Sequence, residues 1–180
     1  MFNAPNYLMV VAAGNDGGDN YSNGIPLDGN SNFDKLSSHA TSKNNMVVAN
    51  ASEIGIDASG DFISVGINSS SSQGPTDDYR IKPDITGKGT NLYSTVESSN
   101  SAYSSLTGTS MASPNVSGTL LLLQQHFNEL NETFMKAATL KGLALHTADD
   151  AGAIGPDAVY GWGLLNAKRA AAVISNRHNG

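Results

Sequence analysis

The sequence predicts an α/β fold in which a parallel β-sheet is flanked by helices. Two short, continuous apolar runs end in turn-forming residues, at residues 7–13 and 46–51. Runs of this kind are typical of strands buried on both faces, as in parallel sheets. The third observation is a long apolar segment after Ser110, followed by two further helical patterns. Together these patterns predict one globular α/β domain.

The predicted strands follow from apolar runs with turn residues on either side. The first run, residues 7–13, is ended by Gly14-Asn15-Asp16-Gly17-Gly18. Parallel sheets bind ligands at the carboxyl ends of their strands, so Asn15 lies at a candidate functional edge. Further strands are expected at residues 46–51, 62–67 and 92–96, with a turn region between Glu53 and Gly60.

Three helices are expected. The first begins at Ser110 and runs, buried, to about Phe127, with Pro114 in its first turn, where a missing N–H costs nothing. Start signals at Asn131-Glu132-Thr133 predict a second helix to about His146. Residues 166–174 form an amphipathic pattern that predicts a closing helix.

Composition excludes several classes of function. The 180 residues carry a formal net charge of −6 and contain no cysteine, so there is no disulfide framework. No Lys/Arg cluster is present to neutralise phosphates, which argues against nucleic acid or anionic membrane as a partner. The apolar stretch at residues 7–13 is too short to span a membrane, and it lacks the flanks of a signal peptide.

Ser110 has the setting of a nucleophile. Gly108 permits a tight turn just before it, and small neighbours allow a substrate carbonyl to approach. At a helix start, unsatisfied N–H groups and the positive end of the helix dipole stabilise an oxyanion. By itself, however, a serine at this place is more often a helix cap.

The longer pattern resembles the subtilases, the subtilisin-like serine peptidases. Residues 108–114, Gly-Thr-Ser-Met-Ala-Ser-Pro, resemble the family's serine motif with Ser110 as nucleophile. Residues 10–15 resemble the strand that ends in the oxyanion-hole asparagine, and residues 82–85 the segment leading towards the serine. Residues 160–167 resemble the closing turn and helix. The matches keep the family's order and cover nearly the whole chain.

The resemblance implies an oxyanion hole formed by the Asn15 side-chain amide and the Ser110 backbone N–H. It also implies a catalytic Asp and His upstream of the asparagine strand, and this chain contains neither motif. Residues 1–180 therefore resemble the C-terminal portion of a subtilisin-like catalytic domain whose N-terminal strands are missing. We expect a serine endopeptidase fragment that is inactive alone, since losing the histidine costs subtilisin roughly a millionfold in turnover.

Two other functions stay open. A non-catalytic subtilase-like module could bind peptides at its strand edges by β-augmentation. A self-sufficient esterase could use His39 as base, which requires His39 within hydrogen-bond reach of Ser110. We discount His39 because the family's catalytic histidine lies upstream of the asparagine strand, and we expect it to be a loop residue.

Polar loops supply the remaining candidate sites. Residues 16–45 predict a long surface loop, in which Asp28 to Asp34 place oxygen atoms at alternate positions. That pattern fails as an EF-hand at Phe33 and His39, so a solvated loop is favoured over structural calcium. The serines at 69–72 and the acidic turn with Asp149, Asp150 and Asp157 are likewise expected to be solvated. No cofactor is expected.

The expected partners follow from the incomplete domain. They are a protein or peptide substrate, the missing N-terminal half of the catalytic domain, and further copies of the chain. Self-association is expected because missing strands would expose an edge of the sheet and apolar helix faces. Family resemblance implies a secreted or cell-envelope location.

Overall fold

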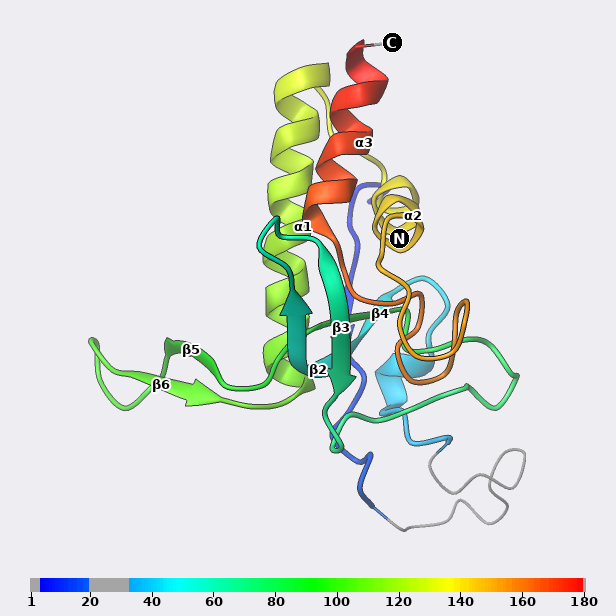
Figure 1. The fold of residues 1–180 in the computed structure, drawn as a ribbon, viewed down its shortest axis with the longest axis vertical. Coiled ribbons are helices and arrows are strands. Elements are labelled where there is room, and N and C mark those ends of the chain that lie inside the picture. The colour runs from blue at the N-terminus through cyan, green and yellow to red at the C-terminus, as the bar shows by residue number, and fades with distance from the viewer. Residues whose placement is uncertain (1–3, 20–32, 180) are drawn as a thin grey trace.

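The computed structural model describes residues 4–19 and 33–179 as a mixed sheet packed against helices (Figure 1). Strand β2 (Met46–Ile56) is central: it pairs in parallel with β1 (Val10–Ala12) and with β4 (Ile85–Lys88). Strand β3 (Phe62–Ile67) pairs with the second half of β2 in antiparallel register. This arrangement confirms the predicted α/β class with parallel strands.

The sheet differs from the prediction at its boundaries. β2 runs on to Ile56, into the stretch expected to turn, because its outer half forms a hairpin with β3. β4 was not predicted, since four residues that include Gly87 carry little strand signal. Its central residues are nevertheless fully enclosed, between β2 on one side and helix α1 on the other.

The last predicted strand lies outside the main sheet. β5 (Leu92–Thr95) pairs only with β6 (Tyr103–Leu106), forming an antiparallel ribbon that projects from the body of the molecule (Figure 1). β6 was not predicted and is exposed along its length. Tyr93 and Tyr103 stack across the ribbon with ring centroids 5.5 Å apart, a cross-strand aromatic pair that stabilises it.

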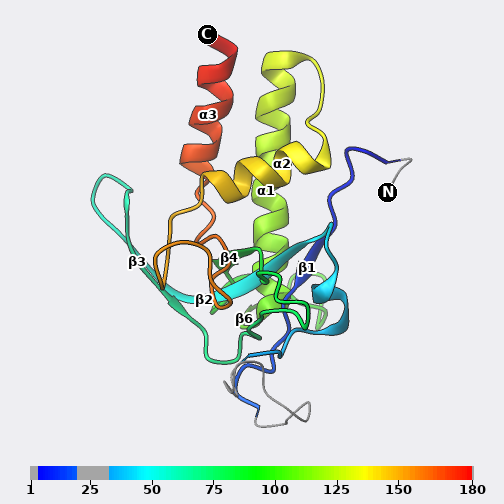
Figure 2. The ribbon, with the colours of Figure 1, turned by 90° about the vertical axis from the view of Figure 1, so that its right-hand side faces the viewer.

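Helix α1 packs on the sheet, and two further α-helices pack against α1 (Figures 1 and 2). Helices α1 (Thr109–Asn131) and α3 (Ala167–Asn179) run alongside each other, and α2 (Ala137–His146) crosses them. A short 3-10 helix, η2 (Ser38–Thr41), precedes β2. No helix within the described ranges is long and apolar enough to cross a membrane.

The predicted start of the second helix was wrong. α1 continues to Asn131, and Glu132 follows in a left-handed conformation (φ 55°) that donates its N–H to Asn128 O. The cap-like residues 131–133 therefore end one helix, and α2 begins only at Ala137. Short polar residues fit either end of a helix, so the local sequence alone does not separate the two.

The core lies between the sheet and the three helices. Its buried side chains come from β2, β4 and all three helices, and α1 supplies the largest share: Met46, Val48, Ile85, Ala112, Val116, Leu120, Leu123, Leu140, Ala144, Ala170 and Ile174. α1 itself is only partly buried, against the prediction: Leu121 and Leu122 are 70% and 67% exposed.

Candidate active site

Ser110 is the second residue of α1 and its side chain is exposed. Gly108 immediately precedes the helix with φ 157° and ψ 165°, a conformation nearly exclusive to glycine. Its N–H donates to Gly89 O at 3.0 Å, which ties the turn to the end of β4. The predicted position of Ser110 at a helix N-terminus is thus where the structure places it.

Pro114 lies in the second turn of α1, not the first as predicted. A proline there has no N–H to offer the carbonyl four residues earlier, which is that of Ser110. The helix therefore begins one turn earlier than the proline signal indicated, because Gly108 and Thr109 already provide its start.

Asn15 follows β1 and lies beside the start of α1. Its Oδ1 accepts hydrogen bonds from the Thr109 backbone N at 2.9 Å and the Thr109 Oγ1 at 3.0 Å. Thr109 Oγ1 in turn accepts from Gly14 N at 3.3 Å. Because the oxygen Oδ1 of the Asn15 amide points towards the helix, the nitrogen Nδ2 of the same amide points away from Thr109. The structure thus brings two predicted site residues, Asn15 and Ser110, to one place.

A groove of about 400 Å³ runs past Ser110, and we call it the Ser110 groove. The ribbon β5–β6 forms one wall and the first turns of α1 form the other: Leu92, Tyr93, Ser94, Thr95 and Leu106 face Ser110, Met111, Pro114 and Asn115. Its lining is mostly apolar, with hydroxyl and amide groups between.

None of the four histidines, all of which lie in the described part of the chain, forms a hydrogen bond with Ser110. His39 lies in η2 and is exposed, and its backbone carbonyl, not its ring, bonds to Asn45 Nδ2 at 2.6 Å. His126 Nε2 bonds to Ser175 Oγ at 2.9 Å, about 24 Å further along α1. His146 and His178 lie at the ends of α2 and α3. Within the described ranges, no hydrogen bond joins the Ser110 hydroxyl to a basic or acidic side chain.

The prediction that the serine-rich stretch 69–72 is solvated was wrong for its second half: Ser69 is exposed, but Ser71 and Ser72 are 0% exposed. Ser71 Oγ accepts from Asn50 N at 3.1 Å, and Ser72 Oγ accepts from Asp16 N at 3.0 Å. These hydroxyls complete the hydrogen bonds of backbone groups in neighbouring segments, which explains their burial. No pattern within the serine run itself indicates this role.

A buried ion cluster lies near the start of β2 and β4. Both Lys82 Nζ and Lys141 Nζ pair with the Asp84 carboxylate, which also accepts from Val47 N at 2.7 Å. Burial lowers the pKa of Lys82, although Asp84 acts in the opposite direction. Asp84 thus links strand β2, through Val47, to helix α2, through Lys141. The sequence did not indicate this role.

The predicted acidic sites show no metal-ligand arrangement within residues 4–19 and 33–179, where no three His, Cys, Asp or Glu side chains cluster suitably. Asp157 accepts backbone N–H groups of Val159 and Tyr160, and Asp149 pairs with Arg169. Asp157 thus shapes its own turn, whereas Asp149 contacts Asn166 and Arg169 near the start of α3. The candidate calcium loop at 28–34 lies outside the described residues except for Phe33 and Asp34.

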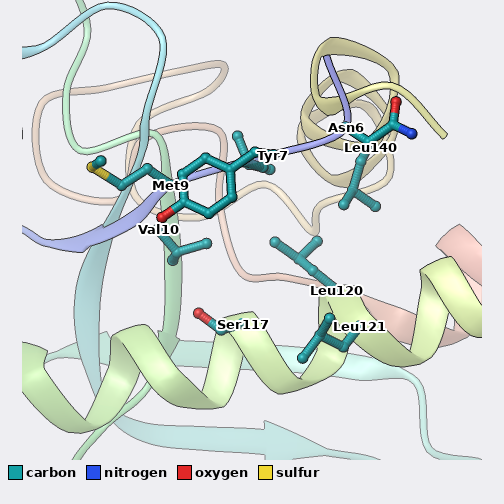
Figure 3. A pocket seen from close by; sticks show the side chains of 9 residues that line it. Asn6, Tyr7, Met9, Val10, Ser117, Leu120, Leu121 and Leu140 are labelled. Carbon is teal, nitrogen blue, oxygen red and sulfur yellow. The ribbon is translucent and has the colours of Figure 1, made fainter. Parts of the chain in front are cut away.

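A second groove lies between β1 and α1, beside the edge of β1 that pairs with no strand in the described part of the chain, and we call it the edge groove (Figure 3). Tyr7, Met9 and Val10 face Ser117, Leu120 and Leu121 of α1 across it, with Leu140 at one end (Figure 3). Its volume is about 400 Å³. The edge groove combines a free strand edge with exposed apolar side chains.

Comparison with known proteins identifies the family. The model of the subtilase family matches residues 3–163. The minor extracellular protease Vpr of Bacillus subtilis is 34% identical over 113 residues, 58% of this chain and 14% of the relative. The PII-type proteinase of Lactococcus lactis subsp. cremoris is 44% identical over 75 residues, 41% of this chain and 4% of the relative.

Solved structures agree with the family match. The CspB protease of Clostridium perfringens is similar with a TM-score of 0.64 at 25% identity, over 81% of this chain and 30% of its own. The prenylagaramide maturation protease PagA has a TM-score of 0.64 at 20% identity, over 92% of this chain and 50% of its own. The chain spans at most half the length of these relatives. With a family match over most of its residues and the same fold, the chain belongs to the subtilase family.

Proposed function

We propose that this chain is the nucleophile-bearing portion of a serine endopeptidase, with Ser110 as its nucleophile. The observation that carries the proposal is that Asn15 is hydrogen-bonded to Thr109, the residue just before Ser110, at the start of α1. Ser110 Oγ attacks the scissile carbonyl carbon, and its proton passes to a base. The Asn15 Nδ2 and Ser110 N–H groups donate to the resulting oxyanion. Collapse of the intermediate releases the amine, and water hydrolyses the acyl-enzyme.

The base and the carboxylate that orients it belong, in this proposal, to a segment outside this chain. Support comes from the histidines, none of which is bonded to Ser110, and from the Ser110 groove, whose lining holds no histidine or carboxylate. The chain therefore holds the nucleophile and the oxyanion donors but would hydrolyse peptides very slowly by itself. Residues 1–180 would be the C-terminal portion of the catalytic domain.

The edge groove is where this second segment would pack. Among residues 4–19 and 33–179, β1 pairs with a strand on one edge only, and Tyr7 and Leu121 beside the other edge are 57% and 70% exposed. A strand added in parallel to β1 would end beside Asn15, because parallel strands share a carboxyl edge. It would thus deliver the residues that follow it to Ser110. The alternative is that the same edge captures peptides without hydrolysing them, as a non-catalytic binding module.

We further propose a secreted or cell-envelope location and a protein or peptide substrate. The supporting relatives are Vpr, named a minor extracellular protease, and NalP of Neisseria meningitidis, named an autotransporter lipoprotein. The Ser110 groove, with its mostly apolar lining, supports a polypeptide substrate.

The test is covalent labelling of Ser110 with a fluorophosphonate probe, read by intact mass. The chain and Ser110→Ala are each treated with and without the N-terminal half of a subtilase catalytic domain. We expect one adduct, on the parent chain only, when that half is present. Labelling of the isolated chain would instead show that a base such as His39 is available locally. If no condition labels the chain, the peptide-binding module replaces the peptidase.

A further inference from the structure

In the loop of residues 14–17, the backbone groups on both sides of Asn15 are hydrogen-bonded to other segments. Gly14 N donates to Thr109 Oγ1 at 3.3 Å, and Gly14 O accepts from Ser72 N at 2.9 Å. Asp16 N donates to Ser72 Oγ at 3.0 Å. Gly17 N donates to Ser70 O at 2.9 Å, and Gly17 O accepts from a lysine. A surface loop rarely has so many fixed groups.

Ser72 contacts the loop on both sides of Asn15. Its backbone N and its hydroxyl bond to Gly14 and Asp16, the two neighbours of Asn15 in the chain. Ser72 is 0% exposed, so its hydroxyl has no solvent contact that competes with the hydrogen bond from Asp16 N. A Cβ at Gly14 would lie 2.6 Å from Ser72 Oγ, which shows how closely the two segments pack. Ser72 therefore sets the path of the backbone through Asn15.

Lys35 is hydrogen-bonded to the same loop at Gly17. Its ammonium donates to Gly17 O at 2.9 Å, and the residue is only 5% exposed. A buried ammonium costs stability unless it is hydrogen-bonded, so a lysine at this place indicates a specific contact. A side chain at Gly17 would collide with the backbone of residues 69–71, which leaves the loop no room to shift on that side.

We infer that Ser72 and Lys35 are positioning residues for the Asn15 amide, holding it where an oxyanion would form. The inference rests on the proposed function, in which Asn15 Nδ2 is an oxyanion donor. Thr109 fixes the oxygen end of that amide, and Ser72 and Lys35 fix the backbone that carries it. Oxyanion donors must be preorganised within a few tenths of an ångström to be effective.

The first arm of the test is nuclear magnetic resonance on the whole chain, with variants Ser72→Ala and Lys35→Met. Each removes one side-chain bond to the loop and keeps the rest of the side chain. Two matched variants serve as controls. Ser70→Ala alters the same segment but keeps the Ser70 O contact with Gly17, and Lys88→Met removes a lysine that donates to Ser52 O instead.

We expect Ser72→Ala and Lys35→Met to speed amide hydrogen exchange at Asp16 and Gly17 by about fivefold, the loss of one hydrogen bond. The Thr109 amide resonance, which reports the bond to Asn15 Oδ1, should shift in both variants. The controls should leave these signals unchanged. If Ser72→Ala, the milder variant, leaves the Asp16 exchange rate and the Thr109 resonance unaltered, the inference is wrong.

The second arm measures peptide hydrolysis by the chain joined with the segment that supplies the base. We expect kcat to fall by about fivefold in Ser72→Ala with KM within about twofold of the parent, because the oxyanion forms only in the transition state. A rise in KM with kcat kept would contradict the positioning role. Failure of the proposed function is seen separately, as Ser110→Ala retaining the parent's activity.

Discussion

Asn15 Oδ1 accepts two hydrogen bonds from Thr109, at 2.9 Å from its backbone N and at 3.0 Å from its hydroxyl. These contacts join the end of β1 to the first residue of α1, across 94 residues of sequence. They also decide which end of the Asn15 amide faces the helix. Among the described residues, these contacts involve the Asn15 oxygen alone, and the Asn15 amide nitrogen forms no hydrogen bond.

The Thr109 hydroxyl is expected to contribute to turnover through this contact. Thr109→Val removes the donor to Asn15 Oδ1 and the acceptor for Gly14 N but keeps the backbone bond. We expect kcat of the completed enzyme to fall by about tenfold with little change in KM, equivalent to one or two hydrogen bonds. Thr109→Ser should restore most of the loss, and equal kcat values for the two variants would contradict this role.

The buried Asp84 cluster is expected to be essential for stability. Asp84→Asn would leave Lys82 and Lys141 near each other without their shared counterion. We expect a loss of about 3–5 kcal/mol in the free energy of unfolding, measured by urea denaturation. Asp61→Asn is the control: its ion pair with Lys168 is exposed and screened by solvent, so its loss should change stability far less than the loss of Asp84. A similar small cost for both would show that Asp84 is not a structural tie.

Gly142 offers a simple gain in stability. It lies within α2, and a Cβ there would meet no atom within 4 Å, so Gly142→Ala should stabilise by about 0.5–1 kcal/mol. Gly87→Ala should have the opposite effect, since its Cβ would lie 2.5 Å from Val116 Cγ2. Thermal unfolding of both variants checks the pair, and a lower melting temperature for Gly142→Ala would contradict the prediction.

Asp78 makes one contribution to acid sensitivity. A hydrogen bond from Arg80, followed by one from Thr76, lowers the pKa of Asp78 from 3.8 to about 2. The unfolded chain therefore binds the proton more readily, and the stabilisation present above pH 3.8 is lost as the pH falls towards 2. We expect the difference in urea midpoint between the parent and Asp78→Asn to shrink over this range. A midpoint difference that stays constant over this range would contradict the prediction.

Self-association is expected to depend on the edge groove. Leu121 lines it and is 70% exposed, whereas its neighbour Leu120 is 3% exposed and belongs to the core. Leu121→Lys should shift the chain towards monomer in sedimentation velocity while leaving the unfolding free energy within about 0.5 kcal/mol. If the parent is already a monomer at high concentration, the edge groove does not drive association.

Features of the fold that depend on residues close together in the chain could be predicted from the sequence. Gly108 before Ser110 predicts a turn into a helix, and the structure has it. The apolar run before Asn15 predicts a buried strand over residues 7–13, whereas β1 covers only Val10–Ala12 and is half-buried. The α/β class followed from the same periodic patterns. The position of Pro114 in α1 and the start of α2 were predicted incorrectly, because Pro114 and residues 131–133 fit more than one place in a helix.

Only the tertiary structure decided which polar residues are buried. Ser72 and Lys35 carry no local signal, because their partners are loop residues 56 and 18 positions away. Likewise, Asp84 is matched by Lys141 on a helix far along the chain. The cost of burying a polar group depends on whether folding brings it a partner, and that partner is set by the packing of strands and helices. For the same reason, the meeting of Asn15 with Thr109, beside Ser110, is a property of the folded chain.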